Sequence, residues 1–221
     1  MNFAKDGSEA VKIFWRIEQW FPELEKQIKD SFKNYHTELL KFNKTVNLIG
    51  VKTIPHADAI HFADCILASR IVVKEETSDI IYDLGSGNGF PGIIFALLMP
   101  TKKFRLVEVD QRKSEFLKHL TTRLGLKNAE VLNRQIESFE AGSINTAVCR
   151  GLAPISRALL MTRKVFAING KLLHLKSEEW ATEVAEIPTQ LCTYWQPSLL
   201  GEYKLPVGEI RYSVVKTEKI G

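Results

Sequence analysis

The chain has 221 residues, 45% of them hydrophobic and 25% charged, with a formal net charge of +4. These proportions are typical of globular proteins and exclude disordered, collagen-like and membrane-embedded classes. The length favours a single α/β core with an addition at one end, and the mildly basic pI of about 8.9 permits a polyanionic partner such as RNA without requiring one.

The first third of the chain has helical periodicity. Between Ile13 and Phe42 apolar residues recur every three or four positions, and we expect Pro22 to begin a second helix there. Another helix is expected over residues 55–70, before a polar break at 75–78. We therefore predict a helical subdomain over residues 1–75. No long apolar block is present near the first residue, so we expect neither a signal peptide nor a membrane anchor, and a cytoplasmic location.

From residue 76 onward, short apolar runs alternate with amphipathic segments. The runs predict strands at 80–84, 104–108, 129–132, 146–149 and 171–175, and the segments between them predict helices at 91–98, 111–124 and 155–167. This alternation predicts a mostly parallel sheet inside one core domain over residues 76–221. Residues 191–195 and 212–217 are expected to add an antiparallel pair around a loop that contains proline and glycine.

A glycine-rich turn joins the first predicted strand to the following helix. Residues 83–92 read D-L-G-S-G-N-G-F-P-G. Glycines allow the backbone to turn sharply and a ligand to approach bare main chain, and a helix start offers free N–H groups. We therefore expect a cofactor here, in contact with Asp83, Gly85, Ser86, Gly87, Gly89, Phe90 and Pro91.

Two cofactor classes fit this turn. The spacing of Gly87, Gly89 and Gly92 also satisfies the dinucleotide fingerprint, so a nicotinamide-dependent oxidoreductase is an alternative. Asp83 can meet the cationic sulfonium of S-adenosylmethionine but would repel a pyrophosphate, and Pro91 hinders the approach of that pyrophosphate. These two residues favour S-adenosylmethionine, with S-adenosylhomocysteine as the product.

An acidic residue follows the turn by about twenty positions. Glu108 closes the second predicted strand, where a carboxylate can accept hydrogen bonds from the hydroxyls of a ribose. Asp110 is a nearby competitor for this role. Both cofactor classes contain a ribose, so this acid supports a cofactor site without choosing between them.

Six segments, taken in order, resemble the RsmG (GidB) family, whose members methylate guanine N7 in bacterial small-subunit ribosomal RNA. They are N-K-T-V-N-L at 43–48, H-F-A-D-C at 61–65, the glycine turn, R-Q-I-E at 134–137, C-R-G-L-A at 149–153 and L-K at 175–176. The resemblance covers residues 35–216, and it departs from the family pattern at Ile60, Gly151 and Ser177. It implies a Rossmann-like class I methyltransferase fold, with a mostly parallel seven-stranded sheet and an N-terminal helical extension.

The resemblance also assigns site residues. It implies that Ile136 and Glu137 flank the adenine, and that Arg150, at the end of the fourth strand, holds cofactor or guanine. We expect replacement of Arg150 by alanine to reduce turnover more than folding. The candidates for contacts with RNA phosphates are Lys44, Arg112, Lys113, Lys176 and Arg211.

The resulting hypothesis is an enzyme that methylates N7 of a guanosine in 16S ribosomal RNA by direct in-line transfer. No general base is needed, because N7 carries a free lone pair; alignment and exclusion of water would supply the rate. We expect a monomer whose partner is the small-subunit RNA or the 30S subunit, with no metal and no membrane contact. A non-catalytic RNA-binding module is a further alternative.

Cysteines and histidines suggest no other chemistry. Cys65, Cys149 and Cys192 lack zinc-site spacing, and we expect each to be a buried thiol. Cys149 could suggest a pyrimidine methyltransferase with a cysteine nucleophile, but no proline precedes it. His61 and Asp64 would share a helix face, which we interpret as a structural hydrogen-bonding pair rather than a metal site.

Overall fold

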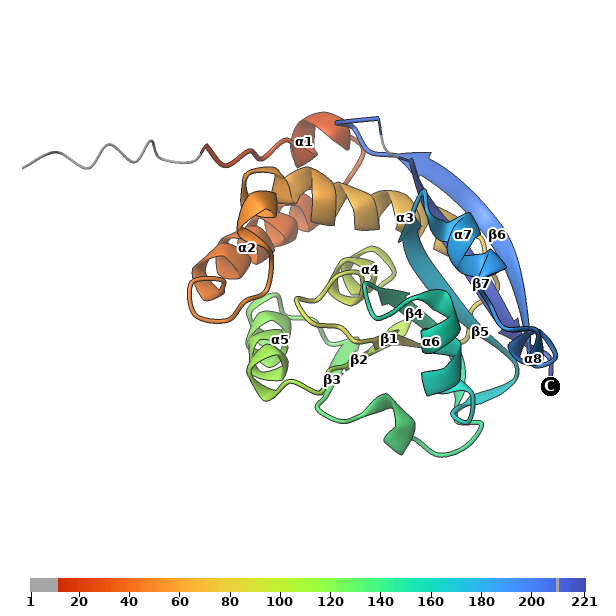
Figure 1. Ribbon diagram of the computed structural model, residues 1–221. Coiled ribbons are helices and arrows are strands. Elements are labelled where there is room, and N and C mark those ends of the chain that lie inside the picture. Colours follow the sequence, from red (N-terminus) through yellow and green to blue (C-terminus); the bar gives the residue numbers. More distant parts are fainter. Residues whose placement is uncertain (1–11, 210) are drawn as a thin grey trace, which may run out of the picture.

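The computed structural model describes residues 12–209 and 211–221, so the parts of our predictions that concern residues 1–11 and 210 lie outside the described residues. It contains a seven-stranded sheet with helices on both faces (Figure 1). In spatial order the strands are β3 (Ala129–Leu132), β2 (Lys103–Val107), β1 (Ile80–Leu84), β4 (Ile144–Arg150), β5 (Phe166–Ser177), β7 (Arg211–Lys219) and β6 (Trp195–Lys204).

Only β7 runs against its neighbours among these strands. The strands β1 to β5 pair in parallel, and β7 is antiparallel to both β5 and β6. This arrangement confirms the predicted α/β class, with its mostly parallel seven-stranded sheet. The order reverses direction beside β1, so the carboxyl ends of β1 and β4 flank the point at which open α/β sheets bind ligands.

The α-helices surround this sheet. They are α1 (Ile17–Trp20), α2 (Lys26–Phe42), α3 (Asp64–Val72), α4 (Gly92–Leu98), α5 (Gln111–Arg123), α6 (Ile155–Thr162), α7 (Trp180–Ala185) and α8 (Thr189–Cys192). Short 3-10 helices cover Val51–His56 and Ile136–Ser138, and a π-helical turn covers Asp58–Ala63. Within the described residues, none of the helices is both long enough and apolar enough to cross a membrane.

Alternating side chains of the strands build two hydrophobic layers. Ile81 of β1 belongs to the layer that contains α2, α3, α4 and α5, whereas Tyr82 and Leu84 belong to the layer that contains α6 and α8. Val148 and Cys149 of β4 divide in the same way. This alternation is the two-residue period of a strand buried on both faces.

The N-terminal helices share a hydrophobic layer with the sheet. Phe32, Tyr35 and Phe62 pack in the same cluster as Phe90 of the glycine turn. Farther along, the carboxylate of Glu75 binds Lys171 Nζ of β5 at 2.9 Å. The division into residues 1–75 and 76–221 stays a prediction, and it would separate two parts of one hydrophobic layer.

Two predicted helix boundaries near the start of the chain are wrong. The second helix begins at Lys26 rather than at Pro22, which lies in a turn. The fixed φ of proline suits a turn as well as the first position of a helix, so the residue alone does not decide between them. The helix expected over residues 55–70 divides into a 3-10 turn, a π-helical turn and α3, with Pro55 inside the 3-10 turn.

Two later boundaries also differ. The helix α6 ends at Thr162, because the chain enters β5 at Phe166 instead of continuing the helix to residue 167. The strand expected at 191–195 is wrong, since Leu191 lies in α8 and β6 begins at Trp195. The strand β6 contains Pro197, which an edge strand tolerates because a missing N–H breaks no inner ladder.

Candidate functional site

The glycine turn lies between the end of β1 and the start of α4. Gly85, Gly87 and Gly89 have φ values of 72°, 52° and 96°, a region that strains residues with a side chain. The N–H groups of Gly85 and Ser86 both donate to the carbonyl of Val107 at 3.0 Å, which fixes the turn against β2. The three alternate glycines are therefore required by the backbone conformation.

Close packing requires the last glycine of the turn. A Cβ on Gly92 would lie 2.4 Å from Leu106 Cδ2 and 2.5 Å from Asp83 Oδ2. No side chain fits at these distances without moving α4 away from the sheet. The first residue of α4 therefore lies directly against β1 and β2.

The carboxylate of Asp83 lies behind the turn. Asp83 is fully buried, and its Oδ2 accepts the N–H of Gly92 at 3.1 Å. Burial raises the pKa of this carboxyl to about 7. Asp83 is absent from the pocket lining, so its position supports the start of α4 and does not favour the direct contact with a cationic ligand that we expected.

Glu108 lies just past the end of β2 and faces the turn. Its Oε2 accepts the N–H of Gly87 at 2.7 Å, and its Oε1 accepts the N–H of Asp110 at 2.8 Å. Each carboxylate oxygen has more than one lone pair, so the group can still accept hydrogen bonds from a ligand. The competitor Asp110 caps α5 instead, since its side chain accepts the N–H of Lys113 at 3.0 Å.

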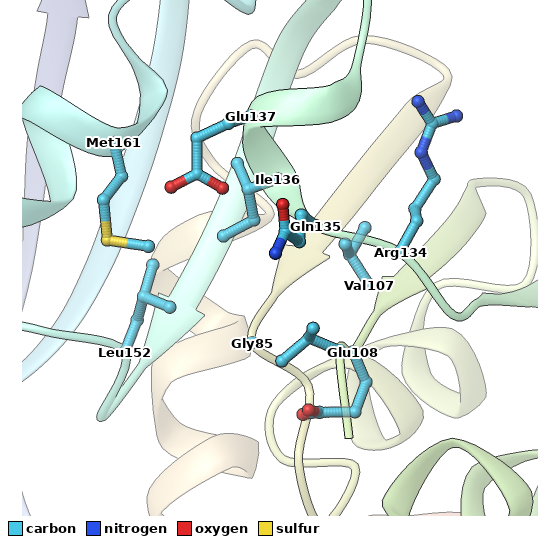
Figure 2. Close-up of a pocket in the computed structure, with 10 residues that line it drawn as sticks. Gly85, Val107, Glu108, Arg134, Gln135, Ile136, Glu137, Leu152 and Met161 are labelled. Atoms are coloured by element: carbon cyan, nitrogen blue, oxygen red, sulfur yellow. The ribbon is translucent and has the colours of Figure 1, made fainter. Parts of the chain in front are cut away.

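A pocket opens beside the turn, at the carboxyl ends of β1, β2 and β4 (Figure 2). Its volume is about 380 Å³, within the range usual for small-ligand sites. Figure 2 shows Glu108 beside Gly85 on one side and Glu137, Leu152 and Met161 on the other. The lining residues are Gly85, Val107, Glu108, Val109, Arg134, Gln135, Ile136, Glu137, Leu152 and Met161.

The pocket contains only some of the residues expected to bind a cofactor. Four of them line it, namely Gly85, Glu108, Ile136 and Glu137. The others shape the turn or lie behind it, namely Asp83, Ser86, Gly87, Gly89, Phe90, Pro91 and Arg150. Sequence reasoning missed the apolar walls Val107, Leu152 and Met161, because an apolar residue that lines a pocket has the same pattern as one in the core.

Arg150 is occupied by other side chains. Its guanidinium donates to Asp64 Oδ2 at 2.8 Å and to the Ile60 carbonyl at 3.1 Å, and lies 2.8 Å from His61 Nδ1. It also stacks over the ring of Phe90, with its Cζ 5.2 Å from the ring centroid. These contacts place Arg150 in a structural network rather than toward the pocket.

His61 and Asp64 meet through this arginine. Both side chains bind Arg150, and neither hydrogen bonds to the other. They are therefore linked through the arginine, whereas we expected a direct hydrogen bond between them. Burial, followed by the charge of Arg150, lowers the pKa of His61 to about 3. A neutral imidazole can accept the hydrogen bond from the guanidinium. Asp64 also accepts the hydroxyl of Tyr203 of β6 at 2.6 Å.

The five residues predicted to contact phosphates lie near the carboxyl ends of the parallel strands, and they differ in their exposure. Lys44 is exposed in the loop after α2, and Arg112 and Lys113 lie in the first turn of α5. Arg211 is exposed at the start of β7. Lys176 differs, because its side chain is mostly buried and its ammonium binds Glu183 Oε2 at 2.7 Å and the Ala153 carbonyl at 3.0 Å.

The thiols support no cysteine nucleophile. Cys149 is buried beside His174, and burial raises its pKa to about 12, so it is not a thiolate at neutral pH. Cys65 is buried as expected, whereas Cys192 is exposed, which corrects the prediction for that residue. Within residues 12–209 and 211–221, no three histidine, cysteine or acidic side chains gather as a metal site would require.

Comparison with known proteins gives consistent matches. A family model described as "GidB: rRNA small subunit methyltransferase G" matches residues 28–197. The chain is 57% identical, over 219 residues, to "Ribosomal RNA small subunit methyltransferase G 3" of Bdellovibrio bacteriovorus, covering 98% of this chain and 99% of that protein. It is 28% identical, over 176 residues, to "Ribosomal RNA small subunit methyltransferase G" of Halorhodospira halophila, covering 80% of this chain and 82% of that protein.

A solved structure supports the fold. A "SAM dependent methyltransferase from Aquifex aeolicus" superposes with a TM-score of 0.51 at 15% sequence identity, covering 67% of this chain and 88% of that chain. At this identity the likeness concerns the fold alone.

Proposed function

The chain belongs to the rRNA small subunit methyltransferase G family, and from this premise we propose that it transfers a methyl group from S-adenosylmethionine to N7 of a guanosine in bacterial 16S ribosomal RNA. Methyl transfer to small-subunit RNA follows from the family. The choice of N7 rests on the six motifs between residues 43 and 176 that resemble this family.

The pocket beside the glycine turn is the observation that carries this proposal. It places the main chain of Gly85 next to the carboxylate of Glu108, and surrounds them with the apolar side chains of Ile136 and Leu152. An adenosine needs this combination: a carboxylate for its ribose hydroxyls and apolar surfaces for its base. We propose that Gly85, Glu108, Ile136 and Glu137 hold S-adenosylmethionine.

The remaining turn residues act by positioning. Asp83 holds the start of α4, and the hydroxyl of Ser86 donates to the Asp83 carbonyl at 2.8 Å. Gly87 presents its N–H to Glu108, which orients that carboxylate before a ligand arrives. We propose that these residues, together with Gly89, Phe90 and Pro91, keep the turn in its binding conformation, which lowers the ordering cost of binding.

S-adenosylmethionine supplies an electrophilic methyl group when bound and leaves as S-adenosylhomocysteine. Guanine N7 carries a lone pair at neutral pH, so no side chain of the chain has to remove a proton. The pocket residues would bind, align and exclude water, effects that can supply roughly 7 to 11 kcal/mol of the barrier.

We propose that the partner is the small-subunit ribosomal RNA or the 30S subunit, and that the protein acts in the cytoplasm, where bacterial ribosomes assemble. The exposed cations Lys44, Arg112 and Arg211 lie near the carboxyl ends of the parallel strands, as the pocket does, which supports approach of RNA from this side. We also propose that it acts as a monomer.

The test is methyl transfer to defined RNA. Purified protein is incubated with methyl-labelled S-adenosylmethionine and either unmethylated 16S ribosomal RNA or small subunits, and the nucleosides are then separated. We expect label in N7-methylguanosine, and its loss in Gly85→Val, which fills the space beside the turn. Label in another nucleoside would overturn the choice of N7.

Methyl labelling together with two binding measurements separates the alternatives. A non-catalytic RNA-binding module would bind the RNA and leave it unlabelled. A nicotinamide-dependent oxidoreductase would bind NADH in calorimetry and would not bind S-adenosylhomocysteine. Family membership disfavours both alternatives, because the related proteins carry the name of methyltransferases.

A further inference from the structure

The loop between α2 and the 3-10 turn at Val51–His56 is closed by one side chain. We call residues 43–49 the 43–49 loop. The Oδ1 of Asn43 accepts the N–H groups of Leu48 and Ile49, both at 2.8 Å. These two hydrogen bonds hold the loop together from within, and both end on the side-chain oxygen of Asn43.

The 43–49 loop is attached to the glycine turn. Asn88, in the middle of the turn, donates from Nδ2 to the carbonyl of Leu48 at 3.0 Å. Its own carbonyl accepts the hydroxyl of Tyr35 of α2 at 2.6 Å. The turn is therefore held from the side of the helical region by two hydrogen bonds, one of which ends in the loop.

The same loop is attached to the other side of the pocket. The guanidinium of Arg112, in the first turn of α5, donates to the carbonyl of Thr45. Just before α5, the N–H of Asp110 donates to Glu108 at 2.8 Å, and Glu108 in turn accepts the N–H of Gly87 at 2.7 Å. The contacts therefore form a ring that runs from the turn through the loop and α5 to Glu108 and back to the turn.

The charge of this region suits a polyanion. Residues 39–57 contain neither aspartate nor glutamate, and this stretch is flanked by Glu38 and Asp58. Within them Lys44 and Lys52 are exposed, and Arg112 lies next to Thr45. Phosphates approaching the edge of the sheet therefore meet cations on the loop that is attached to the cofactor pocket.

We propose that the 43–49 loop is an RNA-docking element whose occupation is coupled to cofactor binding, with Asn43 and Asn88 as positioning residues. RNA held by Lys44 and Arg112 restrains the loop. The loop then limits the motion of Asn88 and Glu108, so cofactor binding loses less conformational entropy. Coupling of this kind is reciprocal, so the cofactor strengthens RNA binding by the same factor. This inference rests on the proposed function.

The test measures coupling directly. The dissociation constant of S-adenosylhomocysteine is determined by equilibrium dialysis, with and without saturating amounts of unmethylated 16S ribosomal RNA or small subunits. We expect binding to tighten about fivefold or more in the wild type, the range typical of coupled sites. Asn43→Ala, which removes the oxygen that accepts both N–H groups of the loop, should bring this factor close to one.

Three further variants make the result specific. Asn43→Asp keeps the acceptor and should restore the coupling; its added charge can weaken RNA binding overall, but this weakening cancels in the ratio. Asn88→Asp removes the donor to Leu48 at similar size and should lose the coupling. Asn128→Ala is the matched control, since Asn128 Nδ2 bridges the carbonyls of Ala96 and Lys102 away from the pocket, and it should keep the coupling.

The outcomes are distinguishable. If the wild type binds RNA and forms N7-methylguanosine, but its affinity for S-adenosylhomocysteine does not change with RNA, the inference is wrong and the proposed function stands. The inference is also wrong if Asn43→Ala and Asn88→Asp both retain the wild-type factor. Failure to bind or methylate RNA at all overturns the proposed function and the inference with it.

Discussion

The hydroxyl of Tyr35 in α2 donates a 2.6 Å hydrogen bond to the main-chain carbonyl of Asn88, in the middle of the glycine turn. The ring of Tyr35 stacks on Phe90 of the same turn, with centroids 4.7 Å apart. A Cβ on Gly89 would lie 2.6 Å from this hydroxyl. The N-terminal helical region therefore shapes the cofactor turn directly.

Replacement of Tyr35 by phenylalanine tests this contact. The variant keeps the ring and removes the hydroxyl, so it should lower the free energy of unfolding by about 0.5 to 1.5 kcal/mol and weaken the binding of S-adenosylhomocysteine. Urea denaturation and calorimetry measure the two effects. Tyr82→Phe is the control, because Tyr82 bonds Arg105 instead of the turn and should change stability alone. Equal cofactor affinity in both variants would contradict the role given to Tyr35.

Replacement of Glu108 by glutamine should weaken cofactor binding. The carboxylate accepts two main-chain N–H groups, and an amide would direct its NH₂ toward one of these donors. Hydrogen bonds to charged groups contribute about 1.5 to 3 kcal/mol, so the dissociation constant of S-adenosylhomocysteine should rise about tenfold or more. In Asp110→Asn the side chain can still cap α5, and calorimetry should find its affinity close to that of the wild type.

The carboxyl of Asp83 should make stability depend on pH. Burial raises its pKa in the folded protein from 3.8 to about 7. A raised pKa means that the folded state holds the proton more tightly, so the contribution of Asp83 to stability is full below pH 4 and is lost as pH rises toward 7. Thermal unfolding between pH 4 and pH 8 measures this loss. In Asp83→Asn this part of the decline should be absent; an unchanged profile would contradict the raised pKa.

Replacement of Arg150 by alanine should affect folding as well as turnover, whereas from the sequence we expected it to reduce turnover more than folding. The substitution leaves the nearly buried carboxylate of Asp64 without its ion-pair partner at 2.8 Å. Breaking a buried pair in this way costs about 3 to 5 kcal/mol of unfolding free energy. Lys26→Ala, which breaks the exposed pair with Asp30, should cost less than about 1 kcal/mol. Normal stability of Arg150→Ala with lost turnover would favour the original interpretation.

Lys44 and Lys176 should behave differently in RNA binding. Lys44 is exposed, so Lys44→Ala should weaken binding and reduce the salt slope of the association constant by about one. Lys176 binds Glu183 and the Ala153 carbonyl, so Lys176→Ala should lower stability and leave the slope unchanged. Filter binding at several salt concentrations, together with urea denaturation, separates the two results. A reduced slope for Lys176→Ala would show that this ammonium reaches the phosphates.

Local sequence pattern predicted most of the sheet. The strands β1 to β5 and the helices α4 and α5 lie within a few residues of their predicted positions, because buried strands and amphipathic helices carry distinct periods. The errors occur where one residue suits two structures, as with Pro22 in a turn and Pro197 in an edge strand. Such choices depend on neighbours that are distant in sequence.

The candidate site divides in the same way. The glycine turn and the acid that follows it were predictable from local sequence, because the turn needs residues that tolerate positive φ and the acid ends the adjacent strand. Contacts between distant segments place Glu108 toward the pocket and Asp83 behind the turn, and they bind Arg150 to Asp64, 86 residues away. Periodicity specifies the face of an element on which a side chain lies. Which partner it meets there depends on the packing of that face against segments from elsewhere in the chain.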